Sequence, residues 1–309
     1  MTYGIAARAC AKGRRWDWAL GMLVEMKREL FEPNVLTYGV ALGACVKGGR
    51  LDCALELWRL MEKQGLVPDT VNYNTVVVAC ARAKQWQQAL GLLGEMSQQS
   101  PGLTVISCNA AMSACGKGSQ WEWALELLAR MALHGPPPDV VSYNGAISAC
   151  EKAAQWTRAL CALAELRRRG LVPDVISYNA AISACEKGSE WEQALSILPE
   201  MERHGVTPDV ISYNAAISAC GNCEQWERAL ELLSAMTARG HKPSVVSYSA
   251  AISACDRGAQ PELALELFRD MQWHDCTPNV VSYSAAISAC EQGRQWKQAL
   301  RLLAQLERR

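Results

Sequence analysis

The feature that most constrains this chain is a block of sequence that returns every 35 residues. The stretch VISYNAAISACEKGSEWEQAL begins at Val175, VISYNAAISACGNCEQWERAL at Val210 and VVSYSAAISACDRGAQPELAL at Val245. The same step recovers further starts at Val35, Thr70, Val105, Val140 and Val280. Self-similarity at this period predicts a stack of identical supersecondary units instead of a single globular core.

The whole chain, residues 1–309, is therefore interpreted as one array of nine repeats. The first repeat lacks one residue and the ninth ends early, giving the bounds 1–34, 35–69, 70–104, 105–139, 140–174, 175–209, 210–244, 245–279 and 280–309. In such an array each repeat buries its apolar face against its neighbours. Neither end carries a capping helix with a polar outer face, so we expect the sequence to be a piece of a longer protein.

Each repeat has the pattern of two short amphipathic helices. In the repeat that begins at Val175, apolar residues recur with the i, i+3, i+4, i+7 spacing of a helix, and a second stripe begins at Trp191. Gly205 then offers a left-handed cap, and Pro208 prevents the helix from continuing. The prediction is an all-α fold, an α-solenoid of stacked helix-turn-helix repeats.

Nine of the 14 cysteines share one register, one per repeat. They are Cys10, Cys45, Cys80, Cys115, Cys150, Cys185, Cys220, Cys255 and Cys290. Packed helices lie about 8–10 Å apart, whereas a disulfide needs Cα atoms within about 7 Å. We interpret these cysteines as small buried hydrophobic residues in a reducing compartment.

Composition and spacing argue against several classes of function. No apolar run approaches the ~18 residues needed to span a bilayer, so we expect no membrane partner. The four histidines lack the spacing of a metal site or catalytic triad. The chain has a lone C-x-x-C sequence, Cys220 to Cys223, and Cys220 already belongs to the packing register. This sequence is therefore weak evidence for a redox or zinc site. We therefore expect no catalytic residues, no metal, no cofactor and no small-molecule substrate.

The repeat carries V-[VI]-S-Y-N-x-x-I-S-A-C-x-K-G, then A-L near its middle and G-x-x-P-D at its end. This pattern, nearly complete in residues 140–174, resembles the pentatricopeptide repeat family in its P-type form. The tetratricopeptide repeat has a 34-residue period and a different start, and neither occurs here. The resemblance implies that the solenoid winds as a right-handed superhelix. It also implies residence in a mitochondrion or chloroplast, and a part in RNA processing, stability or translation.

The resemblance further implies binding of single-stranded RNA, one base per repeat. In this family the fifth and last residues of a repeat together read one base. Here these pairs are Asn74 and Thr104, Asn109 and Asp139, Asn144 and Asp174, Asn179 and Asp209, Asn214 and Ser244, and Ser249 and Asn279. The second residue wedges against a base, here Val71, Ile106, Val141, Ile176, Ile211 and Val246, with Leu36 and Val281 in the same register. A basic thirteenth residue meets the phosphate, here Lys12, Lys47, Arg82, Lys117, Lys152, Lys187 and Arg257.

Two features of the residues favour this hypothesis independently. Asparagine is a poor residue inside a helix, yet it recurs at the fifth position, on a face away from the apolar stripe. The basic register suits a polyanion followed along its backbone. Basic residues at a helix C-terminus also complement the helix dipole by about 0.3–1 kcal/mol each, so this register has an alternative explanation.

The last residue of each repeat has an alternative explanation as well. Asn34, Asp69, Thr104, Asp139, Asp174, Asp209, Ser244 and Asn279 all belong to the set of residues that cap helix N-termini. Capping alone could select every member. It does not explain the change from asparagine to Ser249 at the fifth position, so both roles can coexist.

By the family's rule, asparagine at the fifth position favours a pyrimidine, and serine favours a purine. Aspartate at the end favours U or G, whereas asparagine or serine there favours C or A. Repeats four to eight then predict the core 5′-UUUCA-3′, and Gly4 and Gly39 predict poor discrimination in the first two repeats. The alternative function is a protein-binding helical scaffold without RNA specificity, whose binding would depend only weakly on salt.

Overall fold

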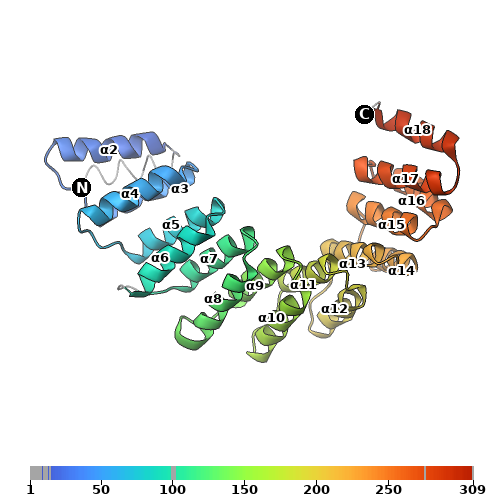
Figure 1. The fold of residues 1–309 in the computed structure, drawn as a ribbon, viewed down its shortest axis with the longest axis horizontal. Coiled ribbons are helices and arrows are strands. Elements are labelled where there is room, and N and C mark those ends of the chain that lie inside the picture. Colours follow the sequence, from blue (N-terminus) through green and yellow to red (C-terminus); the bar gives the residue numbers. More distant parts are fainter. Residues whose placement is uncertain (1–8, 10–12, 14, 99–101, 275, 308–309) are drawn as a thin grey trace. The chain divides into compact units, whose positions relative to one another are not determined.

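The computed structural model describes residues 9, 13, 15–98, 102–274 and 276–307, and within them it contains 17 helices and no strand (Figure 1). The helices are α2 (Trp16–Arg28), α3 (Val35–Lys47), α4 (Leu51–Lys63), α5 (Thr70–Arg82), α6 (Trp86–Gln98), α7 (Val105–Lys117), α8 (Trp121–His134), α9 (Val140–Lys152), α10 (Trp156–Arg168), α11 (Val175–Lys187), α12 (Trp191–Arg203), α13 (Val210–Asn222), α14 (Trp226–Ala238), α15 (Val245–Arg257), α16 (Pro261–Trp273), α17 (Val280–Gln292) and α18 (Trp296–Glu307). From the second repeat on, every repeat supplies a first and a second helix, as its two apolar stripes predict.

The chain divides into two compact parts, Met1–Ala149 and Cys150–Arg309, and each is a stack of helical hairpins. In the N-terminal part the first helices α3, α5 and α7 pack on one another in order. In the C-terminal part α11, α13, α15 and α17 do the same. Within each part a second helix, such as α6 or α14, packs against its own first helix and against the first helix of the next repeat. The predicted α-solenoid of stacked hairpins is thereby confirmed.

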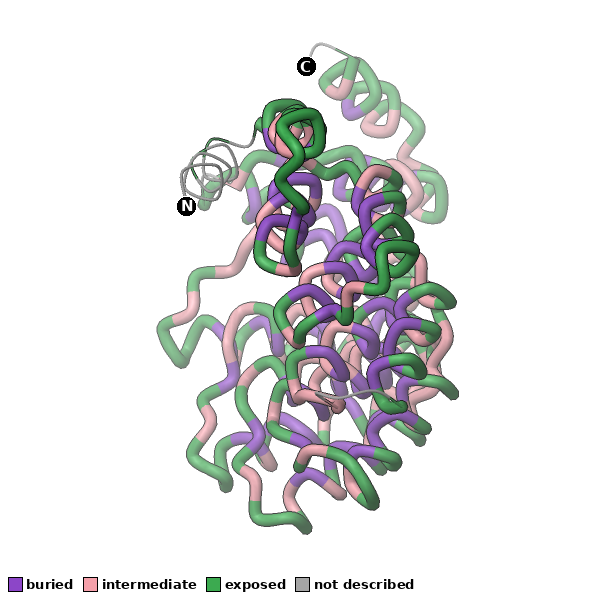
Figure 2. The backbone as a smooth tube through the Cα atoms, turned by 90° about the vertical axis from the view of Figure 1, so that its left-hand side faces the viewer, coloured by how far each residue is buried: buried purple, intermediate pink, exposed green. Residues whose placement is uncertain are grey.

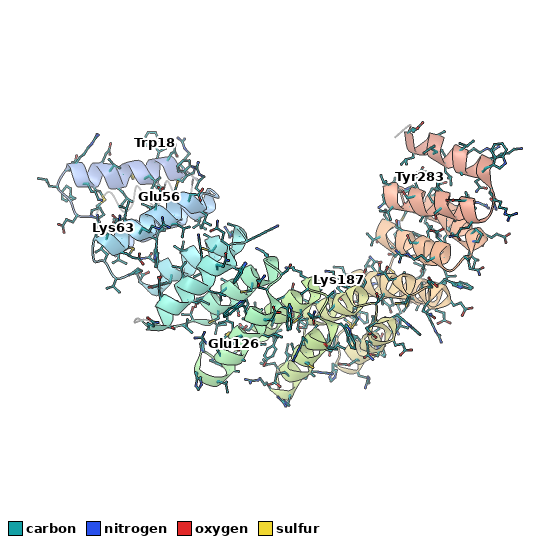
Figure 3. All side chains as sticks on the ribbon, in the orientation of Figure 1. Trp18, Glu56, Lys63, Glu126, Lys187 and Tyr283 are labelled. Atoms are coloured by element: carbon teal, nitrogen blue, oxygen red, sulfur yellow. The ribbon has the colours of Figure 1, made fainter. Side chains whose placement is uncertain are left out.

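The core of each hairpin consists of the residues that the sequence stripes select. In the sixth repeat Tyr178, Ile182, Cys185 and Met201 are all fully buried, and Figure 2 shows buried segments alternating with exposed ones along the helices. Between the eighth and ninth repeats Tyr283 of α17, labelled in Figure 3, packs edge-on against Phe268 of α16 with ring centroids 5.1 Å apart.

The cysteine register is confirmed as a packing register. From Cys45 to Cys290 each of its members is buried and none is in a disulfide, while Cys10 lies outside the described residues. Burial raises the pKa of the Cys185 thiol to about 12, with a smaller contribution from the nearby Glu190 carboxylate. A thiol whose pKa is raised in this way stays protonated and unreactive at neutral pH.

The repeat ends follow the predicted cap in most cases. Gly205 has a φ of 75°, and Gly65, Gly170 and Gly240 are left-handed as well. The fourth repeat differs, because Gly135 is extended with a φ of −109° and α8 is one residue longer than its equivalents. Three consecutive prolines follow Gly135, and they hold the chain extended without a left-handed residue.

The tryptophan that begins a second helix is half-buried, except Trp296, which is 65 % exposed. In four cases the loop between the two helices of the next repeat has a glycine against this ring, and a β-carbon there would collide with the indole, as at Gly188 against Trp156. The same contact joins Trp16 to Gly48, Trp86 to Gly118 and Trp226 to Gly258. The same register holds Ala153 after Trp121 and Cys223 after Trp191. The left-handed residue of the loop at Gly188 is the next one, Ser189, so Gly188 serves close packing and not backbone conformation.

We predict that Gly188→Ala destabilises the array by about 1–3 kcal/mol, because the new methyl group must displace the Trp156 ring. Gly91→Ala is the matched control, since Gly91 lies within α6 with no neighbouring atom within 4 Å of a β-carbon. That change should instead stabilise by about 0.5–1 kcal/mol. Denaturant unfolding followed by circular dichroism measures the free energy of unfolding of the two variants. Equal changes in this free energy would contradict a close-packing role for Gly188.

Candidate nucleic-acid interface

The fifth and last residues of a repeat lie side by side although 30 residues separate them. The Asn179 amide Nδ2 donates to Asp209 Oδ1 at 3.1 Å, and Asn109 Nδ2 donates to Asp139 Oδ1 at 3.2 Å. Equivalent bonds join Thr104 to Asn74 at 3.2 Å, Asn214 to Ser244 at 3.4 Å and Ser249 to Asn279 at 3.3 Å. The remaining pair, Asn144 and Asp174, spans the boundary between the two compact parts. The antiparallel hairpin and the short loop after it bring the two residues together in the five bonded pairs.

The last residue of a repeat also caps the next first helix. Asp209 Oδ1 accepts the backbone N–H of Ser212 at 2.9 Å, while the Asp209 N–H donates to Ser212 Oγ at 3.1 Å. The bond from Asn179 converges on the same oxygen, Oδ1, so these contacts do not use the second carboxylate oxygen. Capping and contact with the fifth residue therefore coexist in one side chain, as the sequence allowed.

These bonds set the protonation state of the carboxylates. Partial burial would raise the pKa of Asp209, but the hydrogen bonds from Ser212 and Asn179 outweigh burial and lower it below its ordinary value. The pKa of Asp139 is lowered in the same way by Ser142 and Asn109 against the effect of burial. Both groups are anionic acceptors at neutral pH.

The sequence reasoning missed the third residue of the repeat. Ser142, Ser212 and Ser247 are fully buried, and each also contacts the fifth residue of the preceding repeat. The signal was present, because serine recurs three residues after every cap from the fourth repeat onward. A capping box usually has Glu or Gln at this place, so serine did not stand out as one.

The second residue of each first helix forms a row of exposed aliphatic side chains. Their exposed fractions lie between 55 and 67 % at Leu36, Val71, Ile106, Val141, Ile176, Ile211, Val246 and Val281. Singly exposed aliphatic residues are ordinary, but a row in one register beside the fifth and last residues is a repeated surface feature. Packing within the hairpin does not account for it.

The basic thirteenth residues are exposed at the ends of the first helices, except Lys12, which lies outside the described residues. Several reach back to the preceding repeat: Lys117 Nζ donates to the Ala81 carbonyl at 3.0 Å, and Arg257 donates to the Gly221 carbonyl at 3.2 Å. These bonds support the helix C-terminus explanation in the absence of a ligand. Lys47, Arg82 and Lys152 occupy the same exposed register.

Acidic residues at position twelve weaken the expected positive row. Lys187, labelled in Figure 3, forms an ion pair of 2.7 Å with Glu151 of the preceding repeat. The neighbouring Glu186 has its pKa raised by burial, which outweighs the nearby Lys187 charge and a hydrogen bond from Ser218. The row is therefore a mixture of cations and carboxyl groups, which the count of basic residues alone did not reveal.

A cavity of about 290 Å³ opens at the eighth repeat beside its fifth and last residues. Ser249 and Asn279 line it, together with the aliphatic Val246 and Val281 and the cation Arg257. One site thus combines a hydroxyl, an amide, two apolar walls and a positive charge, with the Glu186 carboxyl also in its lining. Among the described residues no cluster of His, Cys, Asp and Glu side chains could hold a metal ion.

Comparison with protein-family models gives matches along the chain. The pentatricopeptide repeat domain model matches residues 2–48, 56–118 and 161–223, which is more than half of the sequence. The chain belongs to the pentatricopeptide repeat family. The PPR repeat family model matches residues 208–257, and the PPR repeat model matches 36–66, 106–135, 246–276 and 281–309. A comparison with curated protein sequences gives no match.

The solved structure of one pentatricopeptide repeat protein shares the fold, and two further structures are similar over part of it or at a lower score. PPR10 from maize is 26 % identical with a TM-score of 0.78, over 100 % of this chain and 44 % of the maize chain. PPR10 in complex with an 18-nt psaJ RNA element is 23 % identical with a TM-score of 0.46, over 99 % of this chain and 48 % of that one. The PPR domain of Arabidopsis thaliana protein-only RNase P 1, in complex with tRNA, is 20 % identical with a TM-score of 0.46, over 52 and 84 %. This chain therefore spans less than half the length of PPR10.

We predict a specific pH dependence for the cap at Asp209. Because its folded pKa lies below the ordinary value of about 3.9, Asp209 stabilises the pentatricopeptide repeat array above that value, and the contribution is lost as pH falls through the lowered pKa. Asp209→Asn keeps a capping oxygen but does not titrate. Urea unfolding at several pH values should give a stability difference between parent and variant that is constant from about pH 7 to 5 and shrinks below about pH 4. A difference that stays constant in acid would contradict this.

Proposed function

We propose that this protein binds single-stranded RNA in a sequence-specific manner, one base per repeat, with the core 5′-UUUCA-3′ read by repeats four to eight. The observation that carries the proposal is the side-by-side placement of the fifth and last residues beside an exposed aliphatic side chain. Asn179, Asp209 and Ile211 show it within 35 residues, and the pattern recurs along the array. The activity is binding, with no chemical step of its own.

Uracil fits the pairs formed by asparagine and aspartate. The Asn179 amide places a donor and an acceptor together, which complements the N3–H and a carbonyl of uracil. The ionised Asp209 beside it favours the N3–H donor of uracil over the N3 lone pair of cytosine. Replacing the carboxylate by the neutral Ser244 removes that preference, consistent with C at the seventh repeat.

Adenine fits the eighth repeat. Ser249 Oγ donates to Asn279 Oδ1, and Asn279 Oδ1 also accepts the cap bond from Ser282, so the Asn279 Nδ2 is the group left to donate to a base nitrogen. The adjacent cavity is walled by Val246 and Val281, which could hold a base between them. Apolar contact with both base faces would stabilise any nucleotide, and the polar pair would select among them.

The thirteenth residues would follow the RNA backbone. Lys117 and Arg257 now bond to carbonyl oxygens, and a phosphate offers each a charged acceptor in place of a neutral one. Binding to phosphates releases counterions, so affinity should fall steeply with salt. The ion pair between Lys187 and Glu151 would reduce that dependence at one repeat.

The relatives support the same class of ligand. PPR10, to which this chain is similar, has been solved in complex with an RNA element. We propose, as the family resemblance implies, that the protein resides in a mitochondrion or chloroplast and acts in RNA processing, stability or translation. No described helix combines the length and apolar character required to cross a membrane.

The decisive test exchanges the pair in the eighth repeat. Ser249→Asn combined with Asn279→Asp should change the preferred fifth base of the core from A to U, because the new pair matches that of the sixth repeat. A preference of about five- to 150-fold is expected from contacts worth about 1–3 kcal/mol. Fluorescence anisotropy with four RNAs that differ only at that base measures it at fixed salt.

The single variants are the matched controls. Ser249→Asn alone should favour C and Asn279→Asp alone should favour G at the same base. A flat response to base identity in the parent and all three variants would overturn the code. Weak binding that is also insensitive to salt would favour the protein-binding scaffold instead.

A further inference from the structure

We infer that the third residue of a repeat is a positioning residue for base recognition by the repeat before it, where its hydroxyl contacts the asparagine at that repeat's fifth position. Ser142, Ser212 and Ser247 would hold the amides of Asn109, Asn179 and Asn214 in one orientation. Each site would then have three members from two repeats: the fifth residue, the last residue and the following serine. This inference rests on the proposed function, and its experiment separates the two.

The contact is the shortest that each serine hydroxyl makes to an acceptor. Ser142 Oγ lies 2.7 Å from Asn109 Oδ1, and Ser247 Oγ lies 2.6 Å from Asn214 Oδ1. Ser212 Oγ lies 2.5 Å from Asn179 Oδ1 and 3.0 Å from Asp209 Oδ1. All three serines are fully buried, so water does not compete for the hydroxyl.

The polarity of the bond is set by its surroundings. The backbone N–H of Asp209 donates to Ser212 Oγ, which favours the hydroxyl as a donor toward Asn179 Oδ1. On the other side of the amide, Asn179 Nδ2 donates to the carboxylate of Asp209, which only accepts. The amide is thus held at both ends, with its remaining N–H and the second lone pair of its oxygen available to a base.

The direction of the serine hydroxyl depends on both the fifth and the last residue of the preceding repeat. Where the fifth residue is Ser249, the equivalent Ser282 turns back to its own cap, 2.8 Å from Asn279 Oδ1 and 3.0 Å from the Asn279 carbonyl. Ser282 has the same burial and the same capping bonds as Ser212. In the third repeat the Thr104 hydroxyl itself donates to Asn74 Oδ1, and Ser107 donates to the Thr104 carbonyl. Among the third residues, the hydroxyls of Ser142, Ser212 and Ser247 are directed to the fifth residue of the preceding repeat.

An independent observation links the two positions in the second repeat. Its fifth residue is Gly39, and the third residue of the next repeat is Asn72 instead of serine. The Asn72 side chain is buried and occupies the space of the missing one, because a β-carbon on Gly39 would overlap Asn72 Oδ1. Asn72 Nδ2 donates to the Val35 carbonyl at 3.4 Å. The two positions therefore fill one space between them.

The first test compares Ser212→Ala with Ser282→Ala. Both changes remove the same buried hydroxyl from the same capping box, but only Ser212 contacts a fifth residue. Ser212→Ala should reduce the preference for U at the third base of the core by about three- to tenfold, the value of one net hydrogen bond. Ser282→Ala should leave the preference at the fifth base within about twofold of the parent. Ser212→Thr restores a hydroxyl, as Thr37 does in the second repeat, and should recover the preference.

Base preference is the readout because a purely structural loss lowers affinity for all four bases equally. Equal loss of preference in the two alanine variants, or a uniform loss of affinity without loss of preference, would overturn the inference. A protein-only readout is the ¹⁵N NMR signal of the Asn179 side-chain amide, which should shift in Ser212→Ala and return in Ser212→Thr. An unchanged signal overturns the positioning role, whereas absence of base preference in the parent overturns the proposed function alone.

The second test builds the three-member site where the chain lacks it. Gly39→Asn with Asn72→Ser would give the second repeat the same trio as the sixth, with Asp69 as its last residue. The double variant should gain at least about fivefold preference for U at the base two positions before the core. Gly39→Asn alone should not, because Asn72 occupies the required space. Equal gain in the single variant, or none in the double variant while other repeats discriminate, would overturn the pairing.

Discussion

The bond from the backbone N–H of the third residue to the side-chain oxygen of the preceding repeat's last residue supports most of what is described above. At Asp209 it begins α13, closes the repeat, and fixes the carboxylate beside Asn179. A free N-terminal N–H is a cost for any helix, and a capping oxygen removes it. Because the cap lies at the repeat boundary, the same oxygen joins neighbouring hairpins and defines the proposed recognition site. Structural and binding requirements therefore fall on one residue per repeat.

Much of the fold could be predicted from the sequence, because a period of 35 residues and two apolar stripes leave few alternatives. Cys185, Tyr178 and Ile182 are buried as their spacing predicts. The contacts between residues 30 or 33 positions apart could not be derived in the same way. They depend on where the hairpin turn and the following loop place the next first helix beside the preceding one. The role of Ser212 was hidden for this reason. The reason for glycine at position 188 was hidden in the same way, because only the structure shows that the Trp156 ring leaves no room for a β-carbon there.

The charges of the array also depend on contacts between repeats. The sequence contains as many acidic as basic residues, and the ordered row at position thirteen predicts a positive stripe. In the structure Lys187 is paired with Glu151, and burial keeps the Glu186 carboxyl more easily protonated. The field along the first helices therefore changes from repeat to repeat. Affinity for a phosphate backbone would be distributed unevenly, while the polar pairs stay nearly uniform.

The seam between tryptophan and glycine bears on how such an array can grow. Trp156 lies in the second helix of one repeat, and Gly188 lies in the loop between the two helices of the next. Each repeat therefore contributes one residue to the contact with the repeat before it and one to the contact with the repeat after it. A duplication that begins and ends at the caps supplies both halves in matching order, and the new copy fits beside either neighbour. In this register Leu51 is followed by Ala83, Trp121 by Ala153 and Trp191 by Cys223, so neighbouring copies also join without the glycine. Lengthening the array therefore needs no new interface, only another copy in register.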